Sequence, residues 1–176
     1  FAAGIATSSI GHAHPALVKA ISEQAGQVIH VSNLFRIPQG EKLAARLVAN
    51  TFADSVFFCN SGAEANEGMV KMARRAQFLA GHPERTDIIC MDGAFHGRTL
   101  AMLSATGNPK YLEGFGTPVS GFTHVPFNDI EALRAAITPN TAAIMLEPVQ
   151  GESGIKVADP AYLRALRALC DETGVL

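Results

Sequence analysis

A strand, a turn and a helix in close succession form the first candidate binding site. The apolar run at 56–59 predicts a buried strand, and the spacing of apolar residues over 62–78 predicts a helix. Helix N-termini favour phosphate because their backbone N–H groups are free and their dipole is positive. We therefore expect Gly62 and Ala63 to offer N–H groups to a phosphate, with the Ser61 hydroxyl as a further donor. The alternative is a turn that binds nothing.

Further candidate residues follow two other apolar runs. Phe95 comes just after the run at 87–92 and could stack on a planar ring, although ordinary core packing is an alternative. Arg98 presents a planar guanidinium that suits a carboxylate, unless it pairs with Glu147 or Glu152. These two glutamates could bind a cationic substrate group or form a regulatory ion pair, or they could simply be solvated.

The elements that must position these residues alternate along the chain. Apolar runs predict strands at 56–59, 87–92, 122–127 and 141–149. Prolines predict the starts of two helices, at Pro15 and Pro38, and a third helix is predicted over 62–78. Capping residues predict two more: one from Asn128 or Asp129 to Ile137, and one over 160–174 after the cap Asp159. This order predicts an α/β fold with a mostly parallel sheet and helices on both faces. Since ligands bind at the carboxyl ends of such strands, we expect the candidate residues to meet at one site.

Two further structural expectations concern burial and loops. We expect buried faces on the first two helices, formed by Leu17, Val18, Ile21 and Ala25 and by Leu43, Ala44, Leu47 and Val48. The glycine-rich stretch at 107–121 is expected to be a long functional loop.

Composition and missing motifs exclude several classes of protein. The 176 residues are 48% hydrophobic, enough for the core of one domain, and 14 basic against 16 acidic residues form no basic stripe for nucleic acid. The three cysteines lack CxxC spacing, which indicates a reducing, cytoplasmic setting, and we expect no membrane association. A dinucleotide fingerprint and a Walker lysine motif are missing, and residues 151–155 lack the last glycine of a nucleophile elbow. His12 and His14 lack neighbouring ligands, so no metal is expected.

Five motifs occur in a characteristic order: Phe1-Ala-Ala-Gly-Ile, Gly11-His-Ala-His-Pro, Asn60-Ser-Gly-Ala-Glu-Ala-Asn-Glu, Ala94-Phe-His-Gly-Arg-Thr and Glu147-Pro-Val-Gln-Gly-Glu. Together they resemble the class III pyridoxal-phosphate (PLP) aminotransferases over the whole length of the chain. The resemblance implies fold type I, a homodimer, and transfer of an amino group between an acylated ornithine and 2-oxoglutarate. Succinylornithine, ornithine and 4-aminobutyrate remain alternative substrates. Arg98 weakens the last of these because it favours a substrate with an α-carboxylate.

The resemblance also assigns roles to matching residues. It implies that Gly62 and Ala63 bind the cofactor phosphate and that Phe95 stacks on the pyridine ring, beside the Ser61 hydroxyl already expected as a further phosphate donor. Three are expected at the substrate: Arg98 for its α-carboxylate, Glu147 beside the active site, and Glu152 as a partner of a later arginine. Ser153 stands where the family usually has glycine or alanine.

The resemblance places the lysine that forms a Schiff base with the cofactor beyond Leu176. None of the five lysines, Lys19, Lys42, Lys71, Lys110 and Lys156, lies in a matching context. We therefore expect residues 1–176 to be a partial PLP-binding large domain, truncated at both ends, with its N-terminal segment, its remainder and the small C-terminal domain absent. Such a piece would be inactive alone and would leave an unpaired sheet edge. The alternative is a non-catalytic phosphate-binding or assembly module.

Overall fold

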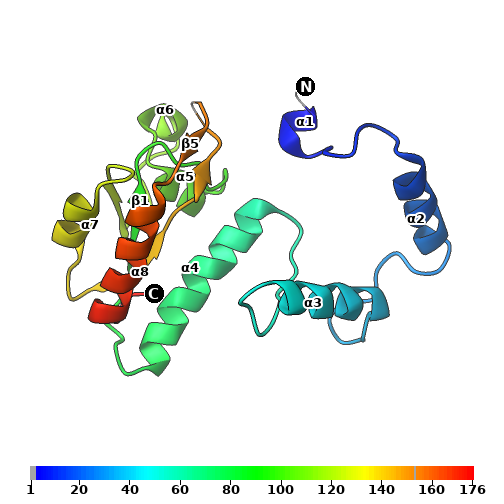
Figure 1. Ribbon diagram of the computed structural model, residues 1–176, viewed down its shortest axis with the longest axis horizontal. Coiled ribbons are helices and arrows are strands. Elements are labelled where there is room, and N and C mark those ends of the chain that lie inside the picture. Colours follow the sequence, from blue (N-terminus) through cyan, green and yellow to red (C-terminus); the bar gives the residue numbers. More distant parts are fainter. Residues whose placement is uncertain (1–2, 153) are drawn as a thin grey trace. The chain divides into compact units, whose positions relative to one another are not determined.

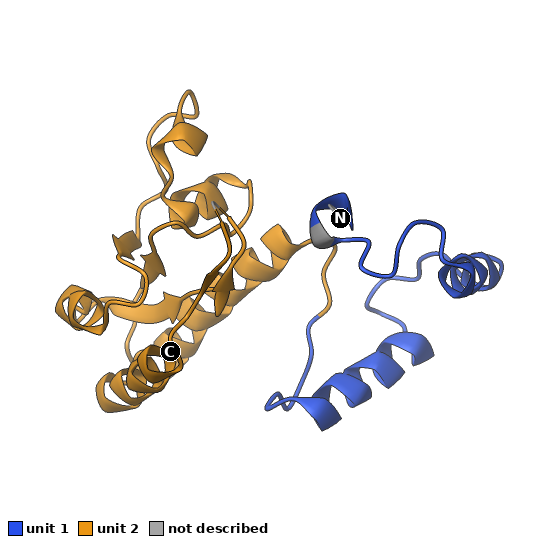
Figure 2. Ribbon diagram, turned by 45° about the horizontal axis from the view of Figure 1, so that its top comes forward, with its two compact units in different colours: residues 1–57 blue, residues 58–176 orange. Residues whose placement is uncertain are grey.

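The computed structural model describes residues 3–152 and 154–176 (Figure 1). The chain divides into two compact units, Phe1–Phe57 and Phe58–Leu176, which Figure 2 colours separately. Ser153 and the first two residues of the opening motif lie outside the described residues, so the expectations for them stay predictions. Among the helices described, none combines the length and the apolar character needed to cross a membrane.

The first unit contains the helices α1 (Ala3–Ala6), α2 (Pro15–Ala25) and α3 (Pro38–Asn50). The structure confirms the helix starts expected at Pro15 and Pro38. Proline fits the first helical position because no N–H is needed there. His14 caps α2, with its Nδ1 accepting a hydrogen bond from the N–H of Ala16 at 3.3 Å. That histidine therefore has a local structural role.

The prediction that α2 and α3 each have a buried apolar face is wrong. Neither helix contains a buried residue, and Leu17, Ile21 and Leu43 are exposed. Apolar spacing predicts which side chains share a face of a helix, but that face is buried only where another element packs on it. In the described part of the first unit, α2 and α3 have no such cover.

The second unit is built on a parallel sheet with the strand order β2-β1-β3. Its strands are β1 (Asp87–Met91), β2 (Phe122–Val125) and β3 (Thr141–Met145). Its helices are α4 (Gly62–Leu79), α5 (Leu100–Thr106), α6 (Pro109–Leu112), α7 (Ile130–Ala136) and α8 (Pro160–Thr173). The short strand β4 (Val149–Gln150) pairs antiparallel with β5 (Lys156–Val157).

The central strand β1 is covered by helices on both of its faces. Ile88 and Cys90 belong to one buried cluster, together with residues of α4, α5 and β3. Ile89 and Met91 belong to a second cluster, together with residues of α7 and α8. Successive side chains of a strand point to opposite faces, so this alternation places helices on both sides of the sheet. The predicted α/β architecture is confirmed.

The strand predicted at 56–59 is wrong. No ladder pairs these residues with another described strand, and Phe57 and Phe58 are 68% and 50% exposed. An apolar, β-branched run favours a strand, but a strand requires a neighbour that accepts and donates its backbone hydrogen bonds. The run is irregular chain between α3 and α4.

Two predicted strands are shorter than expected, and each ends before a proline. β2 ends at Val125, directly before Pro126, and β3 ends at Met145, three residues before Pro148. Proline has no N–H to donate to a ladder, so neither strand continues through it. The residues after Pro148 instead form β4, which pairs with β5.

The region between β1 and β2 contains two helices that the sequence pattern did not predict. Thr99 caps α5, with its Oγ1 accepting a hydrogen bond from the N–H of Met102 at 3.3 Å. Gly107 ends α5 in the left-handed conformation, with φ of 69°. The stretch at 107–121, expected as a loop throughout, also contains α6. Thr99 and Gly107 were the available sequence signals for α5.

The predicted caps of α7 and α8 are confirmed. Asp129 Oδ1 accepts a hydrogen bond from the N–H of Ala132 at 2.9 Å, and Asp159 Oδ1 accepts one from Ala161 at 2.7 Å. Gly174 closes α8 in the left-handed conformation, with φ of 71°. Of the two residues expected as the cap of α7, Asn128 and Asp129, the structure has the aspartate, and α8 begins after Asp159 as expected.

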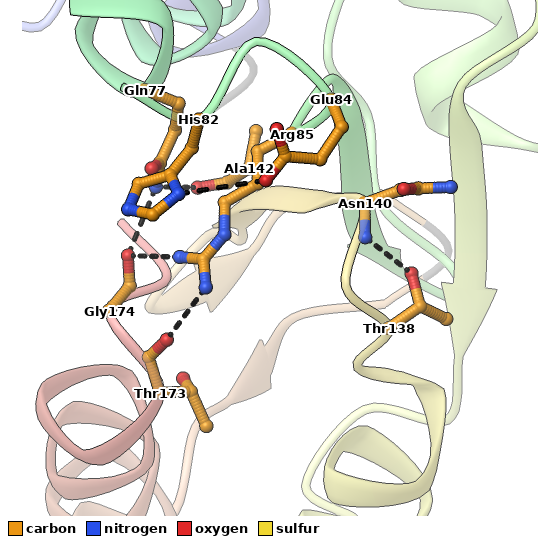
Figure 3. Close-up of polar contacts among 9 residues, drawn as sticks. All are labelled: Gln77, His82, Glu84, Arg85, Thr138, Asn140, Ala142, Thr173 and Gly174. Atoms are coloured by element: carbon orange, nitrogen blue, oxygen red, sulfur yellow. Dashed lines mark hydrogen bonds and ion pairs between the residues drawn. The ribbon is translucent and has the colours of Figure 1, made fainter. Parts of the chain in front are cut away.

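Polar side chains hold the C-terminal end of α8 (Figure 3). Gln77 Nε2 donates to the carbonyl oxygens of Ala142 and Gly174 at 3.1 and 3.0 Å. Arg85 Nη1 donates to the same Gly174 oxygen at 2.9 Å, and its Nη2 donates to that of Thr173 at 3.3 Å. These bonds connect α4, β3 and α8.

Leu176 continues the sheet beside β3. Its N–H donates to the carbonyl of Ala142 at 3.1 Å, and its own carbonyl accepts from the N–H of Ile144 at 2.9 Å. This pair of bonds is the pattern of a parallel ladder. The main chain at Leu176 is therefore already positioned as a strand.

Candidate cofactor and substrate site

The N-terminus of α4 presents free N–H groups. Ser61 is the capping residue, and its Oγ accepts a hydrogen bond from the N–H of Glu64 at 3.2 Å. Glu64 reaches back and accepts a bond from Asn60 N–H at 2.7 Å. The N–H groups of Gly62 and Ala63 have no acceptor among the described residues. They remain available to an anion, where the helix dipole favours negative charge.

The space over Gly62 is open. A Cβ placed there would meet no atom within 4 Å, so a ligand can approach this backbone closely. Open space, unpaired N–H groups and a capping hydroxyl together fit a phosphate group of the kind that PLP carries. The structure thus fits the expected place of the cofactor phosphate.

The loop after β1 packs against this helix start. Gly97 comes so close that a Cβ added to it would lie 2.8 Å from the Cβ of Ala63. Asn66 Nδ2 donates to the carbonyl of His96 at 2.7 Å, and Thr99 Oγ1 donates to Glu67 Oε1 at 2.5 Å. Three contacts therefore tie the loop to the first two turns of α4.

Phe95 lies in this loop and is 37% exposed. Its backbone N–H donates to Glu147 Oε1 at 2.8 Å, and the other oxygen of Glu147 accepts from the N–H of Gly151 at 3.4 Å. The exposure of the ring argues against simple core packing. Glu147 itself holds two backbone segments, so its contacts are those of a positioning residue.

Arg98 lies in a pocket of about 350 Å³ that Leu103, Lys110, Tyr111 and Phe115 also line. Its guanidinium forms no ion pair within 4.0 Å with Glu147 or Glu152, both of which are described. The alternative expectation was that Arg98 pairs with one of these glutamates. The structure does not form that ion pair. The guanidinium remains available to a carboxylate.

Glu152 is bound by a residue that sequence reasoning missed. The Tyr111 hydroxyl donates to Glu152 Oε1 at 3.0 Å. This hydrogen bond and the negative charge of Glu152 raise the pKa of Tyr111, while the charge of Arg98 acts in the opposite direction. Glu152 and Arg98 therefore both lie near Tyr111.

Two buried polar side chains near the loop were also missed. His96 is 3% exposed and Gln150 is fully buried, and neither the Nε2 of the histidine nor the Oε1 of the glutamine has a partner among the described residues. Burial lowers the pKa of His96, although the charge of Glu147 opposes this effect. Gln150 Nε2 donates to the carbonyl of Asp92 at 3.0 Å. The only sequence signal that could have pointed to His96 and Gln150 was their position inside two of the five motifs.

The three stretches that were expected to meet do so. The start of α4 contacts the loop at 95–99, and Glu147 binds that loop through Phe95. Glu152 binds Tyr111, which lines the adjoining pocket together with Arg98. The arrangement can bind a phosphate, cover an aromatic ring and hold a carboxylate.

Comparison with known proteins agrees with this geometry. The family model for aminotransferase class III matches residues 1–176, and the chain belongs to that family. It is 61% identical over its whole length to acetylornithine aminotransferase 1 of Bradyrhizobium diazoefficiens, of which it covers 44%. It is 53% identical to succinylornithine transaminase/acetylornithine aminotransferase of Pseudomonas aeruginosa, again over its whole length and covering 43% of that protein.

A solved structure is similar as well. The ornithine aminotransferase of Toxoplasma gondii ME49 superimposes with a TM-score of 0.93 at 31% identity, over 100% of this chain and 42% of that protein. A second crystal structure of that organism's enzyme has PLP at partial occupancy in the active site. The chain spans less than half the length of the relatives that it matches.

Proposed function

We propose that this chain forms the cofactor-binding part of a longer PLP-dependent aminotransferase. The observation that carries the proposal is the contact of the Phe95–Thr99 loop with both the start of α4 and Glu147. It brings a phosphate-binding helix start, an exposed aromatic ring and an unpaired arginine into one place. A turn that binds nothing would not explain why these three features lie together.

The cofactor roles follow from these positions. The Ser61 hydroxyl and the N–H groups of Gly62 and Ala63 would hold the phosphate of PLP, and Phe95 would cover one face of its ring. When bound, PLP supplies an electron sink that stabilises negative charge on the substrate carbon. The lysine that binds the cofactor covalently would come from a part of the protein beyond residue 176.

The substrate roles concern carboxylates. Arg98 would hold the carboxylate of the amino acid and then of the oxo acid, since its planar fork makes paired hydrogen bonds with such a group. Glu147 would fix the loop by its two backbone bonds, and Glu152 would act at the edge of the same pocket. No metal is needed for these roles.

The proposed reaction moves the amino group of an acylated ornithine to 2-oxoglutarate. Relatives at 53–61% identity are acetylornithine or succinylornithine aminotransferases, which supports an acylated ornithine as donor. Ornithine itself is the closest competing donor, since the similar solved structure is an ornithine aminotransferase. We further propose a homodimer located in the cytoplasm.

The test uses the full-length protein that contains this chain. Incubation with N-acetylornithine and 2-oxoglutarate should yield glutamate, and borohydride reduction should fix one pyridoxyl group on a lysine outside residues 1–176. Arg98→Lys should raise the KM for both substrates about tenfold or more, because the paired hydrogen bonds are lost. The exposed Arg164→Lys in α8 serves as the matched control and should leave the KM unchanged.

Absence of both glutamate and the pyridoxyl adduct would contradict the proposal and favour a non-catalytic phosphate-binding module. Equal KM values for the parent and Arg98→Lys would contradict the role of Arg98 alone.

A further inference from the structure

Three side chains hold the backbone around Phe95. The Phe95 N–H donates to Glu147 Oε1 at 2.8 Å, and the N–H of the next residue, His96, donates to Thr106 Oγ1 at 3.0 Å. The carbonyl of His96 accepts from Asn66 Nδ2 at 2.7 Å. His96 is 3% exposed, so little water is available to replace these partners. The main chain that carries the aromatic ring is therefore fixed at three points.

Asn66 is the member of this set that belongs to α4. It follows Ala63 by three residues, which places both side chains on the same face of the helix. Gly97 packs on Ala63 at that face, and the His96 carbonyl binds Asn66 about one turn further along. The same helix offers the N–H groups of Gly62 and Ala63 at its start. One helix therefore holds both the phosphate end of the candidate site and the loop of its aromatic ring.

We propose that Asn66 is a positioning residue that fixes the ring of Phe95 relative to the phosphate-binding start of α4. The proposal rests on the proposed function, because it concerns the same cofactor site. Asn66 touches the loop backbone and acts on cofactor binding through Phe95. The class of ligand that it serves is a planar aromatic ring carrying a phosphate, since such a molecule must reach both places at once.

The spacing matters because such a ligand is held at two places. It binds best when both places already have the right geometry, since a loop that must be ordered on binding costs part of the affinity. Without Asn66, the His96 carbonyl would lose its partner on α4. The contact of Thr99 with Glu67 would still tie the far end of the loop to the helix. We therefore expect a looser ring rather than a detached loop.

The test measures the binding of two ligands to the full-length protein, freed of cofactor, by titration calorimetry. Pyridoxamine 5′-phosphate carries both the phosphate and the ring but has no aldehyde to react with a lysine, whereas inorganic phosphate reports on the helix start alone. Asn66→Ala should weaken binding of pyridoxamine 5′-phosphate about tenfold, because a hydrogen bond is lost and the loop must be ordered on binding. The affinity for inorganic phosphate should stay within about twofold of the parent value.

Asn140→Ala is the matched control. Asn140 is exposed, and its side-chain amide forms no hydrogen bond with the part of the chain that the structure describes (Figure 3). This variant should bind both ligands as the parent does.

A double variant separates positioning from a general loss of structure. Phe95→Ala removes the ring itself and should also weaken binding of pyridoxamine 5′-phosphate about tenfold. Adding Asn66→Ala to Phe95→Ala should cause little further loss, since Asn66 then has no ring to position. A protein damaged elsewhere by Asn66→Ala would lose affinity in both backgrounds.

Three results would overturn the role of Asn66: equal affinity for pyridoxamine 5′-phosphate in the parent and Asn66→Ala, an equal loss of affinity for inorganic phosphate, or full additivity with Phe95→Ala. Failure of the proposed function is distinguishable from all three, because the parent protein itself would then bind no pyridoxamine 5′-phosphate.

Discussion

Gly97 allows the loop after β1 to lie against the start of α4. Its φ is 133°, a conformation that residues with a side chain rarely adopt, and its missing Cβ leaves room for Ala63. Both the backbone conformation and the close approach to Ala63 therefore require glycine at this position. The placement of Phe95 and Arg98 on either side of it depends on both.

Gly97→Ala should lower the free energy of unfolding of the full-length protein by about 2–4 kcal/mol, because backbone strain and a clash add. Gly81→Ala separates the two effects, since Gly81 has a φ of 91° but open space around it. That control should cost about 1–2 kcal/mol from strain alone. Urea unfolding measures both values, and equal losses would show that the close approach to Ala63 has no energetic weight.

Individual site residues differed in how well the sequence predicted them. Gly62, Ala63, Phe95 and Arg98 follow predicted strands or a predicted helix start, so their types and order indicated their chemistry. The contact of Tyr111 with Glu152 depends on how α6 folds back, and α6 lies in a stretch expected to be a loop. Contacts of this kind require the tertiary structure, because no local pattern specifies them.

Among the elements, α4 and α8 are connected by a buried amide. Gln77 donates to the carbonyls of Ala142 and Gly174, each of which also accepts from another donor, Leu176 N–H and Arg85 respectively. Removing the amide would therefore leave both carbonyls with a partner. The cost should be that of the lost bonds rather than that of stranded acceptors.

Gln77→Met keeps the volume of the side chain and removes both donors. We expect a loss of about 1–2 kcal/mol in the free energy of unfolding, measured by urea denaturation of the full-length protein. Gln39→Met on an exposed site of α3 is the matched control and should be neutral. A loss above about 4 kcal/mol would mean that the carbonyls have no adequate second donor.

The sequence predicted four helix starts accurately, whereas it missed α5 and α6 and predicted one strand that does not form. The starts at Pro15, Pro38, Asp129 and Asp159 are local, since a proline or a capping side chain acts on its own helix turn. The run at 56–59 has equally strong strand character but no ladder, because pairing depends on a partner elsewhere. The same reasoning explains the exposed apolar faces of α2 and α3.

For the whole molecule, burial is unequal between the two units. Both buried clusters consist of residues of the second unit, whereas α2 and α3 contain no buried residue. Burial of apolar side chains is the main source of folding free energy. The second unit therefore has the stronger basis for folding by itself.

A chain of residues 58–176 should show a cooperative urea transition by circular dichroism, and residues 1–57 should show none. Leu133→Ala in the longer piece is the internal control, because Leu133 is fully buried and its truncation should lower stability by about 2–5 kcal/mol. A gradual loss of signal in residues 58–176, insensitive to Leu133→Ala, would contradict an autonomous core in this unit.

The strand order β2-β1-β3 has a consequence for synthesis on the ribosome. β1 forms the middle of the sheet, yet it leaves the ribosome before either of its neighbours. Since translation proceeds at roughly 5–20 residues per second, the apolar segment Asp87–Met91 waits for seconds until Thr141–Met145 emerges. During that interval α4, already complete, is the first surface that can shelter it. Until β3 has been made, the apolar side chains of β1 on the nascent chain are therefore open to aggregation and to chaperone binding.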